Sequence, residues 1–142
     1  MDENPLTPEF PLEFLVLGTP VSAQSQNEKS RTEWKARVRA SAIGVLPEGH
    51  WATSDRMSAI LYYFPAVQMQ GDVDNIVKLV LDAMKQHIYV DDRQVERVVV
   101  QKFEPGNVFP FASPSHKLAE AMERENSVLY IRLSTDPFED LS

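Results

Sequence analysis

The pattern of apolar and polar residues predicts four β-strands. The expected strands cover residues 12–17, 58–64, 95–103 and 128–133, which are short and rich in β-branched, aromatic and other apolar residues. Gly18-Thr19-Pro20 follows the first of them and is expected to form a turn. Short runs of β-formers between such breakers are typical of strands. The chain is therefore expected to contain one sheet of about four strands.

Two further segments have the spacing of helices. Residues 75–86 carry apolar side chains at the i, i+3, i+4, i+7 and i+8 positions of one buried face, and residues 116–125 predict a shorter helix. Together with the strands and one basic helix, they indicate a single α/β (α+β) domain with a mixed sheet and about three helices. We expect this domain over residues 12–133, between an acidic, disordered lead-in at 1–11 and an acidic tail at 134–142.

The basic helix is expected after a polar loop at residues 21–29. Ser30 and Glu33 fit a capping box, so the helix is predicted to begin at Ser30 and to end before Gly44. Its apolar row would face the core and consists of Trp34, Val38 and Ala42. Five basic residues lie in this segment with only Glu33 opposing them: Lys29, Arg31, Lys35, Arg37 and Arg39. They are candidates for contacts with DNA phosphates, and the alternative is a solvated helix face.

The overall charge looks unfavourable for a nucleic-acid partner. The chain has 142 residues, with 14 Lys and Arg against 21 Asp and Glu, a formal net charge of −7. However, residues 1–13 and 134–142 contain acidic residues and no basic ones, so the segment 14–133 is neutral and DNA binding stays open. The absence of cysteine excludes disulfides, Cys-ligated zinc and thiol nucleophiles. Because no membrane span or signal peptide is predicted, we expect a cytoplasmic location.

Acidic residues at two places suggest a metal site. Asp72 and Asp74 are two residues apart, so in an extended backbone their side chains would point to the same side. The chain then runs through the predicted helix and returns to a strand, which can bring Asp92 beside them. Three carboxylates repel one another unless a cation lies between them. Mg²⁺, which prefers oxygen ligands and keeps water molecules for a substrate phosphate, is the expected occupant.

Simpler interpretations exist for most of the residues in this region. Asp74 is a candidate helix N-cap. Asp91 and Asp92 are compatible with an ordinary turn before a strand. Lys78 is placed to pair with Asp74 or Asp82 on an exposed helix face. None of these alternatives explains Asp72 or the occurrence of all these residues together.

The pattern resembles the RusA-type Holliday-junction resolvases, which are small endodeoxyribonucleases. The resemblance lies in Asp72-x-Asp74-Asn75-x-x-Lys78, Asp82-Ala83 and Asp91-Asp92-x-Gln94-Val95. It implies a RusA-like fold and a homodimer, with Asp72, Asp74 and Asp92 as metal ligands, Lys78 as the essential lysine and Asp91 as a supporting acid. One departure is Gly71, which stands where family members usually have Arg or Lys before the first aspartate.

The resemblance implies a Mg²⁺-dependent, structure-selective DNA endonuclease that hydrolyses phosphodiester bonds in four-way junctions during recombination and repair. Mn²⁺ is expected to substitute for Mg²⁺. The expected DNA contacts come from Lys29, Arg31, Lys35, Arg37, Arg39 and Arg93. The main alternative is a catalytically weak or inactive RusA-like module that binds DNA or a protein, since Gly71 removes a positive charge and both tails are acidic. A weaker alternative is that these tails make the protein a DNA mimic or an interaction module.

Overall fold

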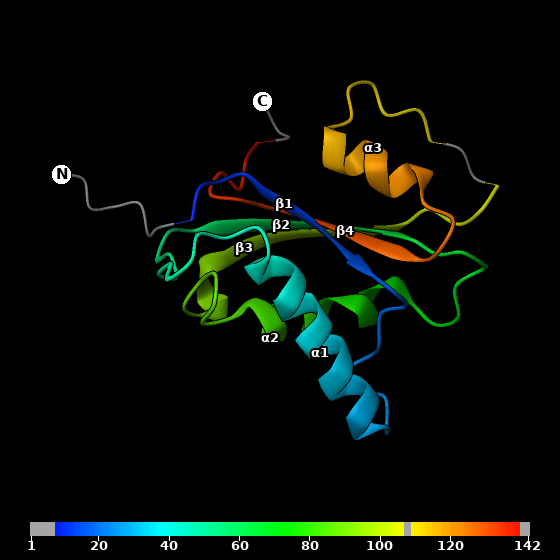
Figure 1. Cartoon of the computed structure of the whole chain (residues 1–142), viewed down its shortest axis with the longest axis horizontal. Coiled ribbons are helices and arrows are strands. Elements are labelled where there is room, and N and C mark those ends of the chain that lie inside the picture. The colour runs from blue at the N-terminus through cyan, green and yellow to red at the C-terminus, as the bar shows by residue number, and fades with distance from the viewer. Residues whose placement is uncertain (1–7, 107–108, 140–142) are drawn as a thin grey trace.

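A mixed sheet forms the centre of the fold (Figure 1). The structure is a computed structural model and describes residues 8–106 and 109–139. Within these residues the strands β1 (Leu12–Leu17), β2 (Met57–Phe64), β3 (Val95–Lys102) and β4 (Val128–Ser134) form a four-stranded sheet in the order β1-β4-β2-β3. β4 is antiparallel to both β1 and β2, whereas β3 is parallel to β2. The predicted mixed sheet of four strands is confirmed.

Helices cover both faces of this sheet (Figure 1). α1 (Glu28–Ile43) and α2 (Val77–Met84) pack on one face, and α3 (His116–Glu123) lies on the other. The larger core lies under α1 and α2 and includes the predicted apolar row of α1. A smaller core lies under α3 and is formed by Ile60, Leu118, Ala121, Val128 and Tyr130. The predicted single α+β domain is confirmed, because both cores share the sheet.

The acidic motifs lie in the connection between the parallel strands β2 and β3. Parallel neighbours need a crossover connection, and here it contains the 3₁₀ turn η1 (Val73–Ile76), α2 and the 3₁₀ turn η2 (Asp92–Gln94). Asp72 and Asp74 therefore lie before α2, and Asp91 and Asp92 lie after it. The helix predicted over 75–86 begins as a 3₁₀ turn and ends at Met84, where Lys85 adopts an extended conformation.

The start of α1 differs from the prediction. Asn27, not Ser30, is the N-cap, and its side chain accepts a hydrogen bond from the Ser30 backbone N–H at 3.0 Å. An N-cap asparagine satisfies one of the free amides of the first turn as well as a serine does. The capping box expected at Ser30 and Glu33 is therefore wrong, and Lys29 lies inside the first turn of the helix.

Residues near both ends of the described chain contact the domain. Phe10 packs against the larger core, and the carboxylate of Glu139 accepts two hydrogen bonds from Arg132, at 3.1 and 3.0 Å. The rest of the expected tails, residues 1–7 and 140–142, lies outside the described residues. In the part of the chain that the structure describes, no helix is long and apolar enough to cross a membrane.

Candidate active site

The segment before α2 presents two exposed aspartates. Asp72 has an extended backbone (φ −101°, ψ 150°) and caps η1 without a side-chain hydrogen bond, while Asp74 lies in the first turn of η1. Among the described residues, neither carboxylate has a hydrogen-bond or ion-pair partner. The extended arrangement predicted for both residues is wrong, because the backbone turns into a 3₁₀ helix directly after Asp72. Both carboxylates are nevertheless available to a ligand from solvent.

The backbone conformation at position 71 favours glycine over the arginine or lysine that family members usually have before the first aspartate. The φ angle of Gly71 is +86°, in the left-handed region that glycine adopts far more readily than other residues. An added Cβ atom would meet no atom within 4 Å, so the constraint here comes from the backbone rather than from crowding. An arginine or lysine at this position would strain the turn that leads into Asp72.

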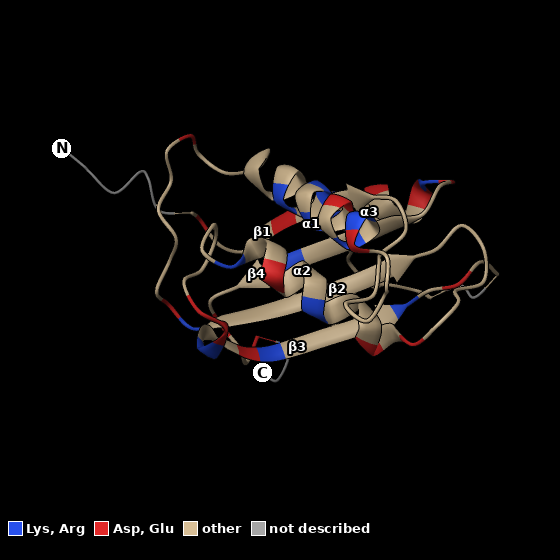
Figure 2. Ribbon diagram, turned by 90° about the horizontal axis from the view of Figure 1, so that it is seen from below, with Lys and Arg blue, Asp and Glu red and all other residues tan. Residues whose placement is uncertain are grey.

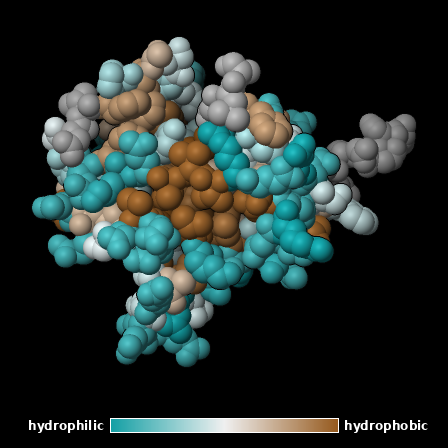
Figure 3. Space-filling model, turned by 180° about the vertical axis from the view of Figure 1, so that it is seen from behind, coloured by the Kyte–Doolittle hydropathy of each residue, from teal (hydrophilic) through white to brown (hydrophobic). Residues whose placement is uncertain are grey.

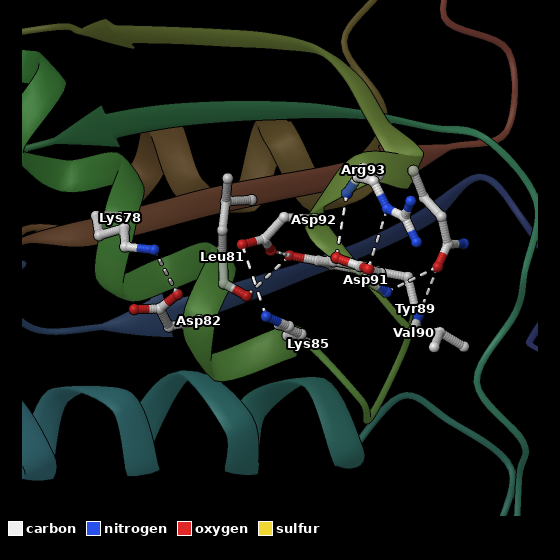
Figure 4. A network of polar contacts seen from close by, with 10 residues as sticks. Lys78, Leu81, Asp82, Lys85, Tyr89, Val90, Asp91, Asp92 and Arg93 are labelled. Carbon is white, nitrogen blue, oxygen red and sulfur yellow. Dashed lines mark hydrogen bonds and ion pairs between the residues drawn. The ribbon is translucent and has the colours of Figure 1, made fainter.

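Lys78 and Asp82 form an ion pair along α2 (Figure 4). The Lys78 Nζ atom lies 3.1 Å from Asp82 Oδ1, one helical turn further on. The hydrogen bond to Asp82 raises the pKa of Lys78, and the charges of Asp82 and Asp92 act in the same direction. The interpretation that Lys78 pairs with Asp82 on an exposed helix face is confirmed. The same pairing favours the charged form of the ammonium group.

Asp92 lies against the middle of α2 (Figure 4). The hydroxyl of the fully buried Tyr89 donates to the backbone oxygen of Leu81 at 2.9 Å and lies 3.5 Å from Asp92 Oδ1. On the other side, Lys85 Nζ is 3.9 Å from Asp92 Oδ2. Burial raises the pKa of Tyr89 above its ordinary value, and the charges of Asp92 and Asp82 add to this rise. Tyr89 is therefore neutral, and it donates its one hydroxyl proton to Leu81 at the shorter distance while its oxygen lies beside Asp92.

Asp91 and Gln94 build the turn that carries Asp92. The Asp91 carboxylate caps η2 and accepts from the backbone N–H and the Nε of Arg93, at 3.4 and 3.3 Å. The backbone hydrogen bond, followed by the charge of Arg93, lowers the pKa of Asp91. The Gln94 side chain reaches back to the backbone N–H groups of Val90 and Asp91, at 2.8 and 2.9 Å. Asp91 thus has the role of a turn former, as the simpler interpretation of the sequence proposed.

The expected approach of Asp92 to Asp72 and Asp74 is not found. In the described residues, no group of three or more acidic or histidine side chains is placed to hold one metal ion. The reason is the position of Asp92 beside Leu81, which is seven residues after Asp74 and hence roughly 10 Å along the helix axis at ~1.5 Å per residue. Asp72 and Asp74 suit Mg²⁺ by donor type and availability, because this ion often uses only one or two carboxylates and keeps water molecules.

Figure 2 shows Lys and Arg positions along α1. By their contacts, the basic residues of this helix fall into two groups. Three guanidinium groups bond to backbone carbonyls: Arg31 to Ser25, Arg37 to Leu17 at 3.2 Å, and Arg39 to Ala83 at 3.3 Å. Lys29 and Lys35 have no side-chain hydrogen bond or ion pair among the described residues. Arg93 is exposed and pairs with Asp91. The two lysines are therefore the bases most available to an external phosphate.

Three residues of the site were not assigned a role from the sequence alone. Asp82 and Gln94 belong to the motif that carries the family resemblance, and Asp82 lies four residues after Lys78, a spacing that allows an ion pair. No sequence pattern indicated that Tyr89 belongs to the site, because its contact with Leu81 and Asp92 depends on the path of the connection between α2 and β3.

Comparison with known families identifies the family of this chain. The family model of endodeoxyribonuclease RusA matches residues 19–109, more than half of the chain. The chain belongs to the RusA family. The match includes α1 and the whole crossover from Asp72 to Asp92, and the RusA family consists of endonucleases that resolve Holliday junctions. A comparison with curated proteins finds no match. Both the RusA resemblance and the RusA-like fold expected from the sequence are confirmed.

Proposed function

We propose that this RusA-family protein is a Mg²⁺-dependent, structure-selective endonuclease that cuts four-way DNA junctions in recombination or repair. The observation that carries the proposal is the RusA match over residues 19–109, in which the acidic and lysine motif of the crossover is complete. The exposure of Asp72 and Asp74 supports it, because neither carboxylate is needed for a contact within the described residues.

Asp72 and Asp74 would bind the metal in this proposal. Mg²⁺ supplies Lewis-acid catalysis when bound, since it polarises the phosphate and lowers the pKa of a coordinated water molecule. Mn²⁺, with similar ligand preferences, would substitute for it. Asp92 would not share this metal, because its carboxylate lies further along α2. The pKa of Lys78 is raised mainly by Asp82, and the charge of Asp92 adds a smaller contribution in the same direction.

Lys78 would stabilise charge on the phosphate. Its ammonium group is largely exposed and is held by Asp82, so it can reach a DNA strand without leaving the helix surface. A positive charge placed beforehand where negative charge develops is an effective way to lower the barrier to phosphodiester hydrolysis. Asp82 then acts as a positioning residue, because it acts through Lys78.

Lys29 and Lys35 would hold the arms of the junction through backbone phosphates. Such contacts give affinity without reading the base sequence, which suits an enzyme that recognises branch shape. Two symmetric cuts across a junction need two active sites, so the proposal includes a homodimer.

The alternative is a RusA-like module that binds branched DNA or a protein partner without cutting. Two observations favour it: the described residues contain no group of three metal-binding side chains, and Gly71 removes a basic charge beside Asp72. It shares every DNA-binding feature with the main proposal, and therefore only a cleavage measurement separates the two.

The test is cleavage of a synthetic four-way junction by the purified full chain. We expect paired cuts with Mg²⁺ or Mn²⁺, no cuts with a chelator, and little cutting of a linear duplex of the same sequence. Salt-sensitive binding of the junction without cleavage, across titrations of both metals, would establish the binding module instead. An absence of salt-sensitive junction binding would contradict both the nuclease and a DNA-binding module, and would leave the protein-binding module.

A further inference from the structure

A small cavity lies directly before Asp72 in the chain. It has a volume of about 170 Å³, and its lining comes from Thr19 and Pro20 after β1, from the segment 65–70 after β2, and from Ser127 before β4. β1 and β2 both run antiparallel to β4, so the segments that follow these two strands meet where β4 begins (Figure 1). The sheet topology therefore places this cavity at the same end of the fold as the start of the crossover.

The loop that forms most of the cavity is fixed at two points. The backbone N–H of Ala66 donates to Ser127 Oγ at 2.8 Å, and that of Met69 donates to Glu104 Oε2 at 2.8 Å. Lys102 Nζ lies 3.2 Å from the same Glu104 oxygen. The cavity is therefore a built feature of the folded chain.

The walls of the cavity are largely apolar, and its rim carries two amides. Pro65 is buried, Met69 is partly buried and Val67 lies at the surface. The side chains of Gln68 and Gln70 are exposed and have no hydrogen bond within residues 8–106 and 109–139. A carboxamide presents a donor beside an acceptor, an arrangement that pairs with the edge of a nucleobase. A flat ring with polar groups on its edge therefore matches both the walls and the rim.

The cavity is separate from the hydrophobic patch that Figure 3 shows at the centre of one face of the molecule. The cavity lies instead at the end of the sheet, between the segments that follow β1 and β2. A broad apolar patch suits contact with another large surface. A recess beside polar side chains suits a small ligand that the polar groups can orient.

The size and position of the cavity favour a single base. Its volume of about 170 Å³ is several times the ~30 Å³ that one water molecule takes, and below the ~300 Å³ at which sites for drug-sized ligands begin. Gln70 is two residues before Asp72, so their Cα atoms lie at most about 7 Å apart. A strand whose phosphate lies at Asp72 therefore brings a neighbouring base to the mouth of the cavity.

A base reaches this cavity only after it leaves the helical stack. Unstacking costs free energy, and the cost is lowest where a base is already poorly stacked or unpaired. A base at the branch point of an open four-way junction lacks a stacking neighbour on one side, whereas a base inside a linear duplex has both neighbours. The cavity therefore favours branched DNA. It does so without selecting one sequence, because a carboxamide can turn over and pair with different bases.

We propose that this cavity binds one unstacked nucleobase of the DNA strand whose phosphate lies at Asp72, with Gln68 and Gln70 hydrogen-bonded to the edge of the base. This role rests on the proposed function, since its ligand is DNA. It adds a physical source for the preference for branched substrates: the two glutamines determine specificity, whereas the carboxylates and Lys78 act on the phosphate.

The test is the fluorescence of 2-aminopurine, a base analogue whose emission is quenched by stacking, in a synthetic four-way junction. The analogue is placed in turn at each position that flanks the branch. The full chain is added in the presence of a chelator, so that no strand is cut. We expect the emission to rise on binding at a branch position and to stay unchanged in a linear duplex. The fluorescence anisotropy of labelled junction and duplex gives the two affinities in parallel.

The test variant is Gln68→Ala with Gln70→Ala. It should weaken junction binding about tenfold and abolish the rise in emission, while duplex affinity stays within about twofold of the wild-type value. Both side chains are exposed, so thermal unfolding should match wild type. The matched control is Gln24→Ala with Gln26→Ala, two exposed glutamines in the loop before α1. It should leave both affinities and the emission unchanged.

Two results would overturn the proposal and leave the proposed function standing. One is tight junction binding in which every flanking 2-aminopurine stays quenched. The other is a rise in emission that the Gln68→Ala, Gln70→Ala variant does not reduce. An absence of salt-sensitive junction binding would overturn both the role of the cavity and the nuclease. A rise in emission that the variant abolishes, with no cleavage once Mg²⁺ is added, would support the cavity and contradict the nuclease.

Discussion

The Lys78 Nζ atom lies 3.1 Å from Asp82 Oδ1, one turn further along α2, and this ion pair holds the ammonium group on the surface of the helix. The hydrogen bond to Asp82 is the main reason that the pKa of Lys78 is raised. We expect Asp82→Asn to lower the pKa of Lys78 and so to move the alkaline limb of the cleavage profile to lower pH. The measurement is the pH dependence of single-turnover cleavage. Glu120→Gln, which breaks the Lys117 pair on α3, is the matched control. If the alkaline limb of the cleavage profile moves equally in Asp82→Asn and Glu120→Gln, or moves in neither variant, then Asp82 does not act through Lys78.

Lys29 and Lys35, whose side chains have no partner within residues 8–106 and 109–139, should carry much of the salt dependence of DNA binding. We expect the Lys29→Ala, Lys35→Ala double variant to reduce the slope of log affinity against log salt by about 1–2, the value for one or two lost phosphate contacts. Neither lysine has a hydrogen bond or ion pair to the part of the chain that the structure describes, so the free energy of unfolding should stay within about 0.5 kcal/mol of the wild-type value. The slope is measured by junction binding without divalent metal. Lys117→Ala with Arg124→Ala, on the opposite face of the sheet, should leave it unchanged. Equal slopes for all three proteins would exclude α1 from the DNA interface.

Gln94 should be important for stability although it is a polar residue near the surface. Its Nε2 donates to the backbone oxygens of Thr53 and Asp55, at 2.9 and 2.7 Å, so it ties the segment before β2 to the turn before β3. Gln94→Glu replaces this donor with an acceptor, and we expect it to destabilise the fold by about 1–3 kcal/mol. The measurement is urea denaturation. Gln26→Glu, in the exposed loop before α1, should have little effect. Equal stability of both variants would show that the Gln94 contacts are not needed.

Asp91 should make the fold sensitive to acid. Its pKa lies below the ordinary value of 3.8 because the carboxylate accepts the backbone hydrogen bond of Arg93. A carboxyl group with a lowered pKa in the folded state stabilises the protein above its unfolded pKa, and this contribution is lost as the pH falls through the folded value. We therefore expect wild type to be more stable than Asp91→Asn at neutral pH and the difference to shrink below pH 3.8. Urea denaturation across this range measures it. A difference that does not vary with pH would contradict a role for the ionised carboxylate.

The strands and the buried face of α2 were predictable because periodicity is a local property. Alternation and i, i+3, i+4 spacing identify which side chains enter a core without any knowledge of the neighbours. The start of α1 was less predictable, because Asn27 and Ser30 are both good N-caps, and the choice depends on which side chain reaches a free amide.

The position of Asp92 could not be predicted from the sequence. It depends on the contact of Tyr89 with Leu81 and on the bonds of Gln94 to Thr53 and Asp55. The Gln94 bonds join segments that are distant in the chain. The motif identifies the residues of the site, whereas the distances between them depend on tertiary contacts. The same holds for the pairing partner of Lys78, for which spacing alone allowed both Asp74 and Asp82.

The central claim is that the exposed carboxylates before α2 support metal-dependent cleavage. Asp74→Asn removes one charge from a side chain that has no partner among the described residues, so thermal unfolding should match wild type. Cleavage of a four-way junction with Mg²⁺ should fall at least about 100-fold, as expected when metal-assisted hydrolysis loses a ligand. Asp55→Asn, an exposed aspartate outside the crossover, should cut at the wild-type rate. A folded Asp74→Asn protein that cuts the junction as fast as wild type would contradict the account.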